Sequence, residues 1–451
     1  FLMLSNKKNI TMGYKISFTN KEITPWAGLG FLHKMLEKME FRKDISRCRA
    51  LPEPGSNCGY KSINIIEAFM VSIWCGANRF QHTEVTRQDK ALGKIFGWKR
   101  TPGNDTIKRF FRKFDLEKSS ILSEHLFGWV FENVKFDRYT LDCDSTILTR
   151  YGKQQEGAKK GYNPKKPGRK SHHPIIAFVN DLKLVANFWL RSGESSSANN
   201  FAAFLEDTIK KLKDKKIGLL RLDSGFYSKE VFELMERKLL DYVVAVKFYI
   251  PIQKMISLQQ NWLIVDEGIE ICDTSYQSPE WDKPRRIVVV RQKLEDRPDA
   301  IGKSLSLFEG TQYYCKYKYT GYITNLKLSA AEVWRLYRQR ADSENRIKEL
   351  KEDFGLDSFN LKEFYATEST LTVAMLAYNL MALFRLYILK SEVQHQLSTM
   401  RYKVFAIGAY FVKNKDRYIL KIALAKQRRK WFKGLWDTAD NCSLPFFAPI
   451  A

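Results

Sequence analysis

The sequence predicts an α/β protein in which helices cover both faces of a mixed sheet. Short apolar or alternating runs bounded by Gly, Pro and Asp are typical of strands. They occur at residues 136–145, 174–180, 184–191, 218–223 and 242–247. Apolar residues at helical spacing separate some of these runs, at 199–212 and 229–238. Strands and helices in this mixed order build a layered α/β sheet.

The chain is long and strongly basic, with 451 residues and a formal net charge of +25 at pH 7. This length favours several domains, and the charge indicates a polyanionic partner, most simply nucleic acid. A membrane is the competing partner. The longest uncharged apolar run, at 371–384, is too short to cross a bilayer and contains Asn379, so it predicts a buried helix. We therefore expect a cytoplasmic protein without a membrane segment.

The first 134 residues are predicted to form a helical DNA-binding domain, with helices at 29–39, 63–74 and 121–131. A possible helix-turn-helix lies between them. A short helix at 91–96 and turn residues at 97–103 precede a second helix that ends near residue 114. The second helix carries cations suited to phosphate contacts, namely Lys108, Arg109 and Arg112. An ordinary amphipathic helix is an equally good interpretation.

The remaining chain is predicted to divide into a catalytic core at 135–247, a β-rich insertion at 248–318, a second part of the core at 319–390 and a basic C-terminal region at 391–451. Residues 401–451 hold eleven Lys or Arg against three acids, which predicts a second DNA-contacting surface.

A basic segment follows the first predicted strand. Residues 150–170 contain eight Lys or Arg and one Glu, together with several Gly and Pro. This composition predicts a mobile loop that contacts DNA, with Arg169 and Lys170 as candidate phosphate ligands; a merely solubilising loop is the alternative. The adjacent His172 and His173 favour a structural or phosphate-contacting role over metal binding, because neighbouring strand residues point to opposite faces.

Three carboxylates are candidates for a metal site. Asp144 and Asp223 stand at the ends of predicted strands, and Asp142 is an alternative to Asp144 on the same side of its strand. Glu344 lies in a predicted continuous helix, 334–354. Carboxylates from neighbouring strand ends and a facing helix make an all-oxygen site of the kind that Mg2+ prefers.

Glu344 shares a narrow stripe of the predicted helix with Tyr337, Arg340 and Lys351, within an arc of roughly 60°. On spacing alone, such a stripe is more typical of a solvated, salt-bridged face. Whether the stripe is a functional site or a solvated face depends on the residues that it contacts elsewhere in the chain.

Asp144-Ser-Thr, Asp223-Ser-Gly-Phe-Tyr and the Tyr-x2-Arg-x3-Glu-x6-Lys spacing that begins at Tyr337 together resemble the DDE transposases of bacterial insertion sequences. The resemblance is to the branch with the Y-R-E-K signature and covers most of the chain. It implies a ribonuclease H-like core and nucleoid-associated DNA transposition. It also implies that Asp144, Asp223 and Glu344 hold two ions, Mg2+ or Mn2+, for phosphoryl transfer.

The resemblance further implies that Tyr337, Arg340 and Lys351 grip phosphates near the cut end. An aromatic residue of the insertion, Trp262 or Trp281, would hold a displaced base by stacking, although both could equally pack a small β subdomain. The expected partners are double-stranded DNA with the element's terminal inverted repeats, target DNA, and a second copy of the chain. The alternatives are a silent, domesticated DNA-binding protein and a metal-dependent nuclease without transposition.

Overall fold

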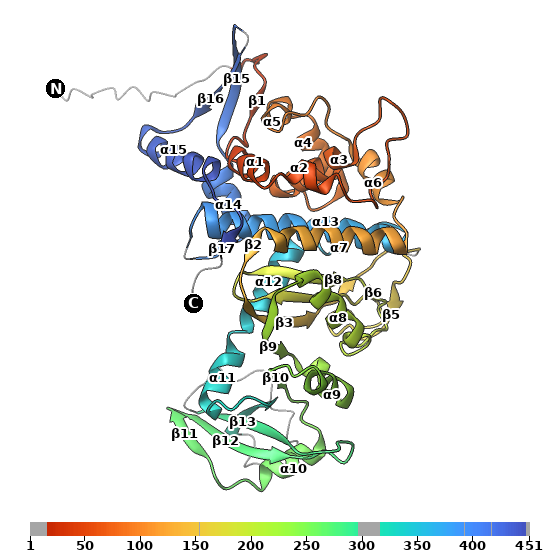
Figure 1. Ribbon diagram of the computed structural model, residues 1–451, viewed down its shortest axis with the longest axis vertical. Helices are drawn as coiled ribbons and strands as arrows, with labels where there is room; N and C mark the ends of the chain where they lie inside the picture. The colour runs from red at the N-terminus through yellow and green to blue at the C-terminus, as the bar shows by residue number, and fades with distance from the viewer. Residues whose placement is uncertain (1–15, 153, 296–315, 392, 416, 448–451) are drawn as a thin grey trace, which may run out of the picture.

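The centre of the fold is a nine-stranded mixed sheet with the strand order β11-β12-β13-β14-β10-β9-β3-β7-β8 (Figure 1). The computed structural model describes residues 16–152, 154–295, 316–391, 393–415 and 417–447. Parallel pairing joins three adjacent inner strands, β3 (Arg138–Ser145), β9 (Lys216–Leu222) and β10 (Tyr242–Ala245). The antiparallel strands β7 (Ile175–Val179) and β8 (Leu184–Trp189) complete one edge. The mixed α/β class is therefore confirmed.

Three strands of the predicted insertion, together with the first strand of the predicted second part of the core, extend this sheet and do not interrupt it. β11 (Leu263–Asp266), β12 (Ile269–Tyr276), β13 (Arg285–Lys293) and β14 (Tyr317–Thr324) form an antiparallel series. β14 pairs with β10. The free edge of β10 offers unpaired backbone groups, and β14 satisfies them. Helix α10 (Ile250–Ser257) lies at the start of this segment.

Helices pack on the sheet from both sides. α13 (Phe364–Leu383) lies against β8 and α7 (Leu116–Glu132), whereas α8 (Phe201–Leu212) and α9 (Lys229–Arg237) follow β8 and β9 along the chain. The stretch Phe364–Ile388 is long and apolar enough to cross a membrane, but 89% of its most apolar window is buried inside the protein. The expected buried helix is confirmed.

Asn379 explains how a polar residue fits into this apolar helix. Its Oδ1 accepts a hydrogen bond from the backbone N of Val185 at 2.7 Å, and its Nδ2 donates to the Val185 carbonyl at 2.8 Å. The amide thus supplies the edge strand β8 with the two bonds that a further strand would give. Both buried backbone groups are satisfied.

The N-terminal helices are α1 (Leu29–Lys38), α2 (Phe41–Ile45), α3 (Ser62–Trp74), α4 (Thr83–Arg87), α5 (Lys90–Ile95) and α6 (Asn104–Phe111). The C-terminal segment folds back onto them. β15 (Gly408–Asn414) pairs with β16 (Arg417–Ala423) and with β1 (Ile23–Thr24). α15 (Lys426–Asp440) packs on α1, with the Phe31 and Phe432 ring centroids 4.6 Å apart. The two ends of the chain therefore share one body (Figure 1).

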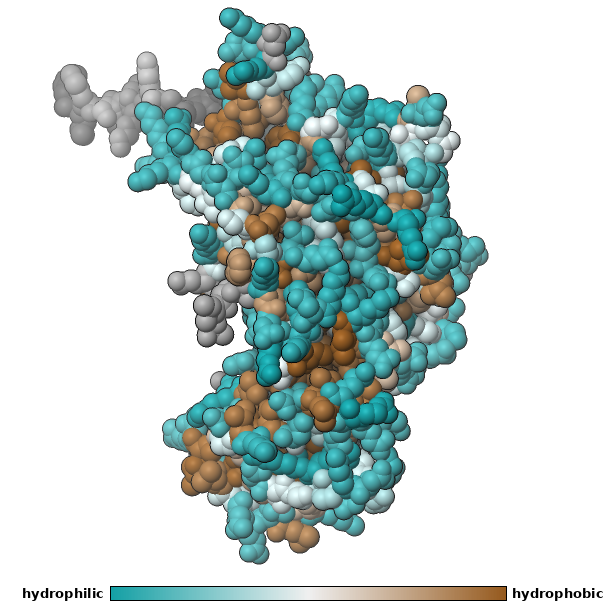
Figure 2. All heavy atoms as spheres, in the orientation of Figure 1, coloured by the Kyte–Doolittle hydropathy of each residue, from teal (hydrophilic) through white to brown (hydrophobic). Residues whose placement is uncertain are grey.

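Three shorter elements complete this end: α14 (Leu397–Met400), β2 (Val134–Lys135) and β17 (Phe446–Phe447), of which the last two pair in parallel. Hydrophilic residues cover most of the face shown in Figure 2, as the 75 Lys and Arg of the sequence require.

The predicted continuous helix at 334–354 is wrong, because the segment forms two helices, α11 (Ala330–Arg338) and α12 (Ala341–Glu352). The break coincides with a hydrogen bond from a neighbouring strand. Arg221 Nη1 on β9 donates to the Leu336 carbonyl at 2.7 Å, in place of the backbone N four residues later. That backbone N, of Arg340, bonds the Tyr337 carbonyl instead. A side chain inserted into the helical hydrogen-bond ladder breaks the helix at this point.

The basic segment after β3 is folded, which corrects the expected mobile loop. We call residues 148–152 and 154–172 the β4–β6 unit, which contains a small sheet of β4 (Leu148–Thr149), β5 (Lys159–Lys160) and β6 (Lys170–His172). Arg150 is buried at its centre, where Nε donates to His172 Nδ1 at 2.9 Å and Nη1 donates to the Asp357 carbonyl at 2.7 Å. Polar contacts to the loop after α12 thus replace an apolar core.

Candidate active site

Strand register brings Asp144 and Asp223 together. β3 and β9 are parallel, and Cys143 lies opposite Leu222. Asp144 follows Cys143 and Asp223 follows Leu222, so the two aspartates lie at the carboxyl ends of neighbouring strands. Asp144 is buried, and its Oδ1 accepts from the Ser145 backbone N at 2.8 Å. Asp223 is half-buried, and its Oδ1 accepts from the Gly225 backbone N at 2.9 Å. These bonds fix both carboxylates at the same edge of the sheet.

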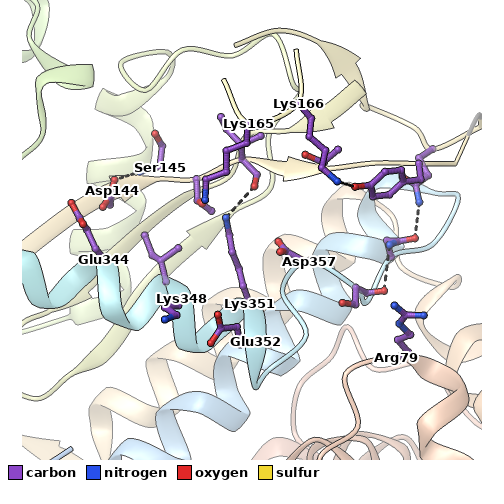
Figure 3. Close-up of a pocket in the computed structure, with 18 of the residues that line it drawn as sticks. Arg79, Asp144, Ser145, Lys165, Lys166, Glu344, Lys348, Lys351, Glu352 and Asp357 are labelled. Atoms are coloured by element: carbon purple, nitrogen blue, oxygen red, sulfur yellow. Dashed lines mark hydrogen bonds between the residues drawn. The ribbon is translucent and has the colours of Figure 1, made fainter. Parts of the chain in front are cut away.

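Glu344 approaches from the first turn of α12 and is exposed. It lines the same cleft as Asp144, and Figure 3 shows the two side chains next to each other at one end of that cleft. Throughout the described ranges, no group of three or more His, Cys, Asp or Glu side chains converges closely enough to hold a metal ion.

The electrostatics of Asp144 favour a further positive charge. Burial, opposed by Arg340 and reinforced by the nearby carboxylates of Asp223 and Glu344, raises the pKa of Asp144 from 3.8 to about 6. Arg340 Nη2 lies 3.1 Å from Asp144 Oδ2. Burial and two neighbouring acids destabilise the charged form of a carboxylate, and a bound cation would offset this destabilisation.

Asp142, the alternative to Asp144, is fully buried below the site. Its two oxygens accept from Arg221, at 2.6 Å from Nε and 2.8 Å from Nη2, and Ser343 Oγ donates to Oδ2 at 3.1 Å. These three hydrogen bonds, from the two residues Arg221 and Ser343, saturate the carboxylate inside the core. Asp144, and not Asp142, is therefore the acid of β3 that reaches the cleft.

The other members of the stripe contact the strand ends. Tyr337 Oη donates to the Leu222 carbonyl at 3.2 Å, and Arg340 Nη2 donates to the Cys143 carbonyl at 3.1 Å. Arg340 is buried, whereas Lys351 is half-buried and its Nζ donates to the Ile147 carbonyl at 3.1 Å. The stripe is thus neither a solvated face nor a straight helical row; it ties α11 and α12 to β3 and β9.

The cleft has a volume of about 1150 Å3 and runs from Asp144 and Glu344 to Arg79 (Figure 3). Four of its cations were not among the predicted site residues: Arg79, Lys165, Lys166 and Lys348. Lys165 and Lys166 belong to the β4–β6 unit and lie across from α12. Their position in the basic segment 150–170 could have marked them as candidate site residues. Arg79 comes from the loop between α3 and the short turn at 80–82, and no local sequence pattern marks it.

The predicted helix-turn-helix cations do not line the cleft. Lys108 lies 6.0 Å from the ring centre of Phe80, the neighbour of Arg79, and Arg112 pairs with Glu363 at 3.5 Å. Arg109 is exposed. The apolar face of α6 is buried, so these cations sit on the outer face of an amphipathic helix. Arg169 and Lys170 are exposed on the β4–β6 unit.

The two insertion tryptophans have different surroundings. Trp281 is 5% exposed and packs against Phe232 and Arg285, so the base-stacking expectation for this residue is corrected to a packing role. Trp262 is half-buried, and the Arg291 guanidinium lies 4.0 Å from its ring centre. One face of the Trp262 ring is therefore covered.

His172 should make the β4–β6 unit sensitive to acid. Burial, with help from Arg150, lowers its pKa from 6.5 to about 4. Its Nδ1 accepts from Arg150, so Nε2 carries the proton and donates to the Glu156 carbonyl at 2.8 Å. Between pH 6.5 and pH 4, His172 is protonated in the unfolded chain but not in the folded chain. The contribution of His172 to the free energy of unfolding therefore falls as the pH drops from 6.5 to 4, and it does not change above pH 6.5.

The free energy of unfolding is expected to fall by up to about 3 kcal/mol between pH 6.5 and pH 4. His172→Asn keeps an acceptor for Arg150 but does not titrate, so its unfolding free energy should fall less over this pH window. Denaturant titrations of both proteins from pH 7 to pH 4.5 measure the difference. Parallel pH dependences for the two proteins would contradict the assignment.

Comparison with known proteins identifies a matching family. The family model described as Transposase DDE domain group 1 matches residues 6–440. No curated protein sequence matches the chain. Among solved structures, the chain is similar to the piggyBac transposase synaptic complex with hairpin DNA, at 11% identity and a TM-score of 0.43, over 83% of this chain and 78% of that chain.

Proposed function

Because the chain belongs to the transposase DDE domain family, we propose that it is the cut-and-paste transposase of a bacterial insertion sequence. Members of this family are DNA transposition enzymes, and they generally use divalent metal ions, usually Mg2+. The observation that carries the proposal is the register of β3 and β9, which sets Asp144 beside Asp223, with Glu344 on the same cleft as Asp144.

The three acids fit a divalent ion by their chemistry. They offer only carboxylate oxygens, the ligands that Mg2+ prefers, and burial of Asp144 makes a compensating cation favourable. When bound, two such ions supply an activated attacking oxygen and a stabilised leaving oxygen for phosphoryl transfer. Asp144, Asp223 and Glu344 would hold them.

The chain's own residues would position the DNA. Lys351 and Arg340 lie on either side of Glu344 along the chain, and we assign them, with Tyr337, to the phosphates near the cut end. Arg340 also pairs with Asp144, with Nη2 3.1 Å from Oδ2. The Tyr337 hydroxyl and Arg340 also hold the two strand ends to the helices, so both residues would fix the spacing between the acids.

DNA binding should depend strongly on salt. Basic groups at 108–113, on the β4–β6 unit and at 401–433 should each displace counterions from phosphates. Every phosphate contact contributes about −0.9 to the slope of log affinity against log salt concentration. Gel-shift titrations of an inverted-repeat duplex over a range of KCl concentrations give the slope, and a flat dependence would rule out this mode of binding.

The proposed function is tested by transposition in vitro. Purified protein and Mg2+ are mixed with a plasmid that carries a marker between the inverted repeats flanking the gene, plus a target plasmid. Excised marker and marker joined to the target are the expected products. Cleavage without joining would support the nuclease alternative, and binding without cleavage would support a domesticated regulator.

A further inference from the structure

The backbone pairing that aligns β3 with β9 ends just before the acids. Cys143 and Leu222 form the last pair of this ladder, so Asp144 and Asp223 each lie one residue beyond it. Two carboxylates at neighbouring strand ends repel each other, and they can share ions only if their spacing is held in place. Contacts outside this ladder therefore help to set the spacing of the two acids.

Ser197, in the loop after β8, touches the residues that follow both acids. Its hydroxyl oxygen lies 2.7 Å from that of Ser145, a hydrogen-bond distance, and Ser145 is the direct neighbour of Asp144 (Figure 3). Ser197 also packs against Gly225, because a Cβ at Gly225 would lie only 2.6 Å from Ser197 Oγ. One small side chain thus contacts the ends of both strands.

Gly225 belongs to the turn that holds Asp223. Its backbone N donates to Asp223 Oδ1 at 2.9 Å, and a Cβ at this position would lie 2.9 Å from the same oxygen. This distance, like the 2.6 Å to Ser197 Oγ, is well below an ordinary van der Waals contact. Only glycine therefore leaves room for the carboxylate and for Ser197, which links the position of Ser197 to that of Asp223.

The loop that carries Ser197 is anchored to the core. Arg191 is 6% exposed, and its Nη1 donates to the carbonyls of Ser197 at 3.3 Å and Asn199 at 2.8 Å. Its Nε donates to the His173 carbonyl at 3.0 Å, and the His173 backbone N donates to the Arg191 carbonyl at 3.0 Å. A residue can position two strand ends only if its own backbone is held, and these bonds hold it.

We propose that Ser197 is a positioning residue of the metal site. Its contacts hold the two strand ends at the spacing that lets Asp144 and Asp223 share divalent ions. This inference rests on the proposed function. Residues that orient metal ligands without touching the metal change metal affinity by about 10- to 100-fold when they are replaced. Ser197 is not among the residues that line the cleft, so it acts through its neighbours.

The test is Ser197→Ala, which removes the hydroxyl without adding an atom. Binding of Mn2+ to the full-length protein on an inverted-repeat DNA end is measured by electron paramagnetic resonance, with the DNA alone as the blank. The Mn2+ concentration at half-saturation should rise about 10-fold over that of wild type. Cleavage should also need about 10-fold more Mn2+ for half its maximal rate, whereas the rate at saturating Mn2+ should stay within about 3-fold.

The matched control is Ser196→Ala, the same change in the adjacent exposed residue. Its Oγ donates to Asn199 Oδ1 at 2.6 Å and does not contact Ser145, so Mn2+ affinity should equal that of wild type. Ser145→Ala should weaken Mn2+ binding by itself. Combined with Ser197→Ala, it should bind no more weakly than the weaker of the two single variants, because both remove one hydrogen bond. Effects that add would overturn the bridge.

Unchanged Mn2+ affinity in Ser197→Ala, or an equal loss in Ser196→Ala, would overturn the inference. Denaturant titration of Ser197→Ala detects a merely structural role, which would lower the free energy of unfolding and leave Mn2+ affinity unchanged. Wild-type protein separates the two proposals. If it neither binds Mn2+ nor cleaves the DNA end, the proposed function fails. If it does both and Ser197→Ala matches it, only the positioning role fails.

Discussion

Asp144→Asn is expected to reduce Mg2+-dependent DNA cleavage by at least about 1000-fold while DNA-end binding stays within a few-fold of wild type. The amide keeps the shape of the side chain and the acceptor for the Ser145 backbone N, but it removes the charge that attracts the metal. Metal ions contribute several kcal/mol to such reactions, and about 4 kcal/mol corresponds to this rate. Single-turnover cleavage and gel-shift affinity, measured side by side, give both quantities.

Asp223→Asn and Glu344→Gln should cause losses of the same order. The matched control is Glu352→Gln, which makes the same chemical change on the same helix and the same cleft, eight residues away from Glu344. Near-wild-type cleavage is expected for this control. Near-wild-type cleavage by any of the three variants would remove that acid from the proposed site, and a loss with Glu352→Gln would move the site along α12.

Asp142→Asn is expected to lower the free energy of unfolding by about 3–5 kcal/mol, the usual cost of leaving one partner of a buried ion pair uncompensated. Asp142 and Arg221 are both fully buried, and the pair joins β3 to β9. Ser343 and the Leu336 carbonyl depend on the same pair, so the change also loosens the junction of α11 and α12. Denaturant titration at neutral pH measures the effect.

Two controls separate charge burial from simple loss of a contact. The double variant Asp142→Leu with Arg221→Met removes both charges and should recover much of the lost stability, since apolar pairs of similar volume often replace buried ion pairs. Asp282→Asn changes a 79% exposed partner of Lys229 and should leave stability nearly unchanged. A double variant less stable than Asp142→Asn would contradict this explanation of the pair.

The sheet and the positions of two acids could be predicted because their signals are local. Alternating or apolar runs end at Asp144 and Asp223, and parallel strands bring such ends to one edge. The helix break at Arg340 could not be predicted in this way. It depends on Arg221, which is 115 residues away from Leu336 in the sequence and takes the carbonyl that a straight helix would use.

The β4–β6 unit shows a second limit of local patterns. Its many lysines and few apolar residues are typical of a mobile loop, yet Arg150 and Glu156 bind it to the loop after α12, about 200 residues further along the chain. Long-range polar contacts leave no periodic trace in a sequence. The burial of Trp281 could not be predicted from the sequence either, because a single aromatic residue suits either a core or a binding surface.

The most direct test of the metal site is a crystal structure of the protein with an inverted-repeat DNA end and Mn2+, in which anomalous scattering locates the metal. We expect manganese between the carboxylates of Asp144, Asp223 and Glu344, next to the phosphate at the cut. Manganese at Glu352 and Asp357, the other acids of the cleft, or no manganese in the cleft at all, would contradict it.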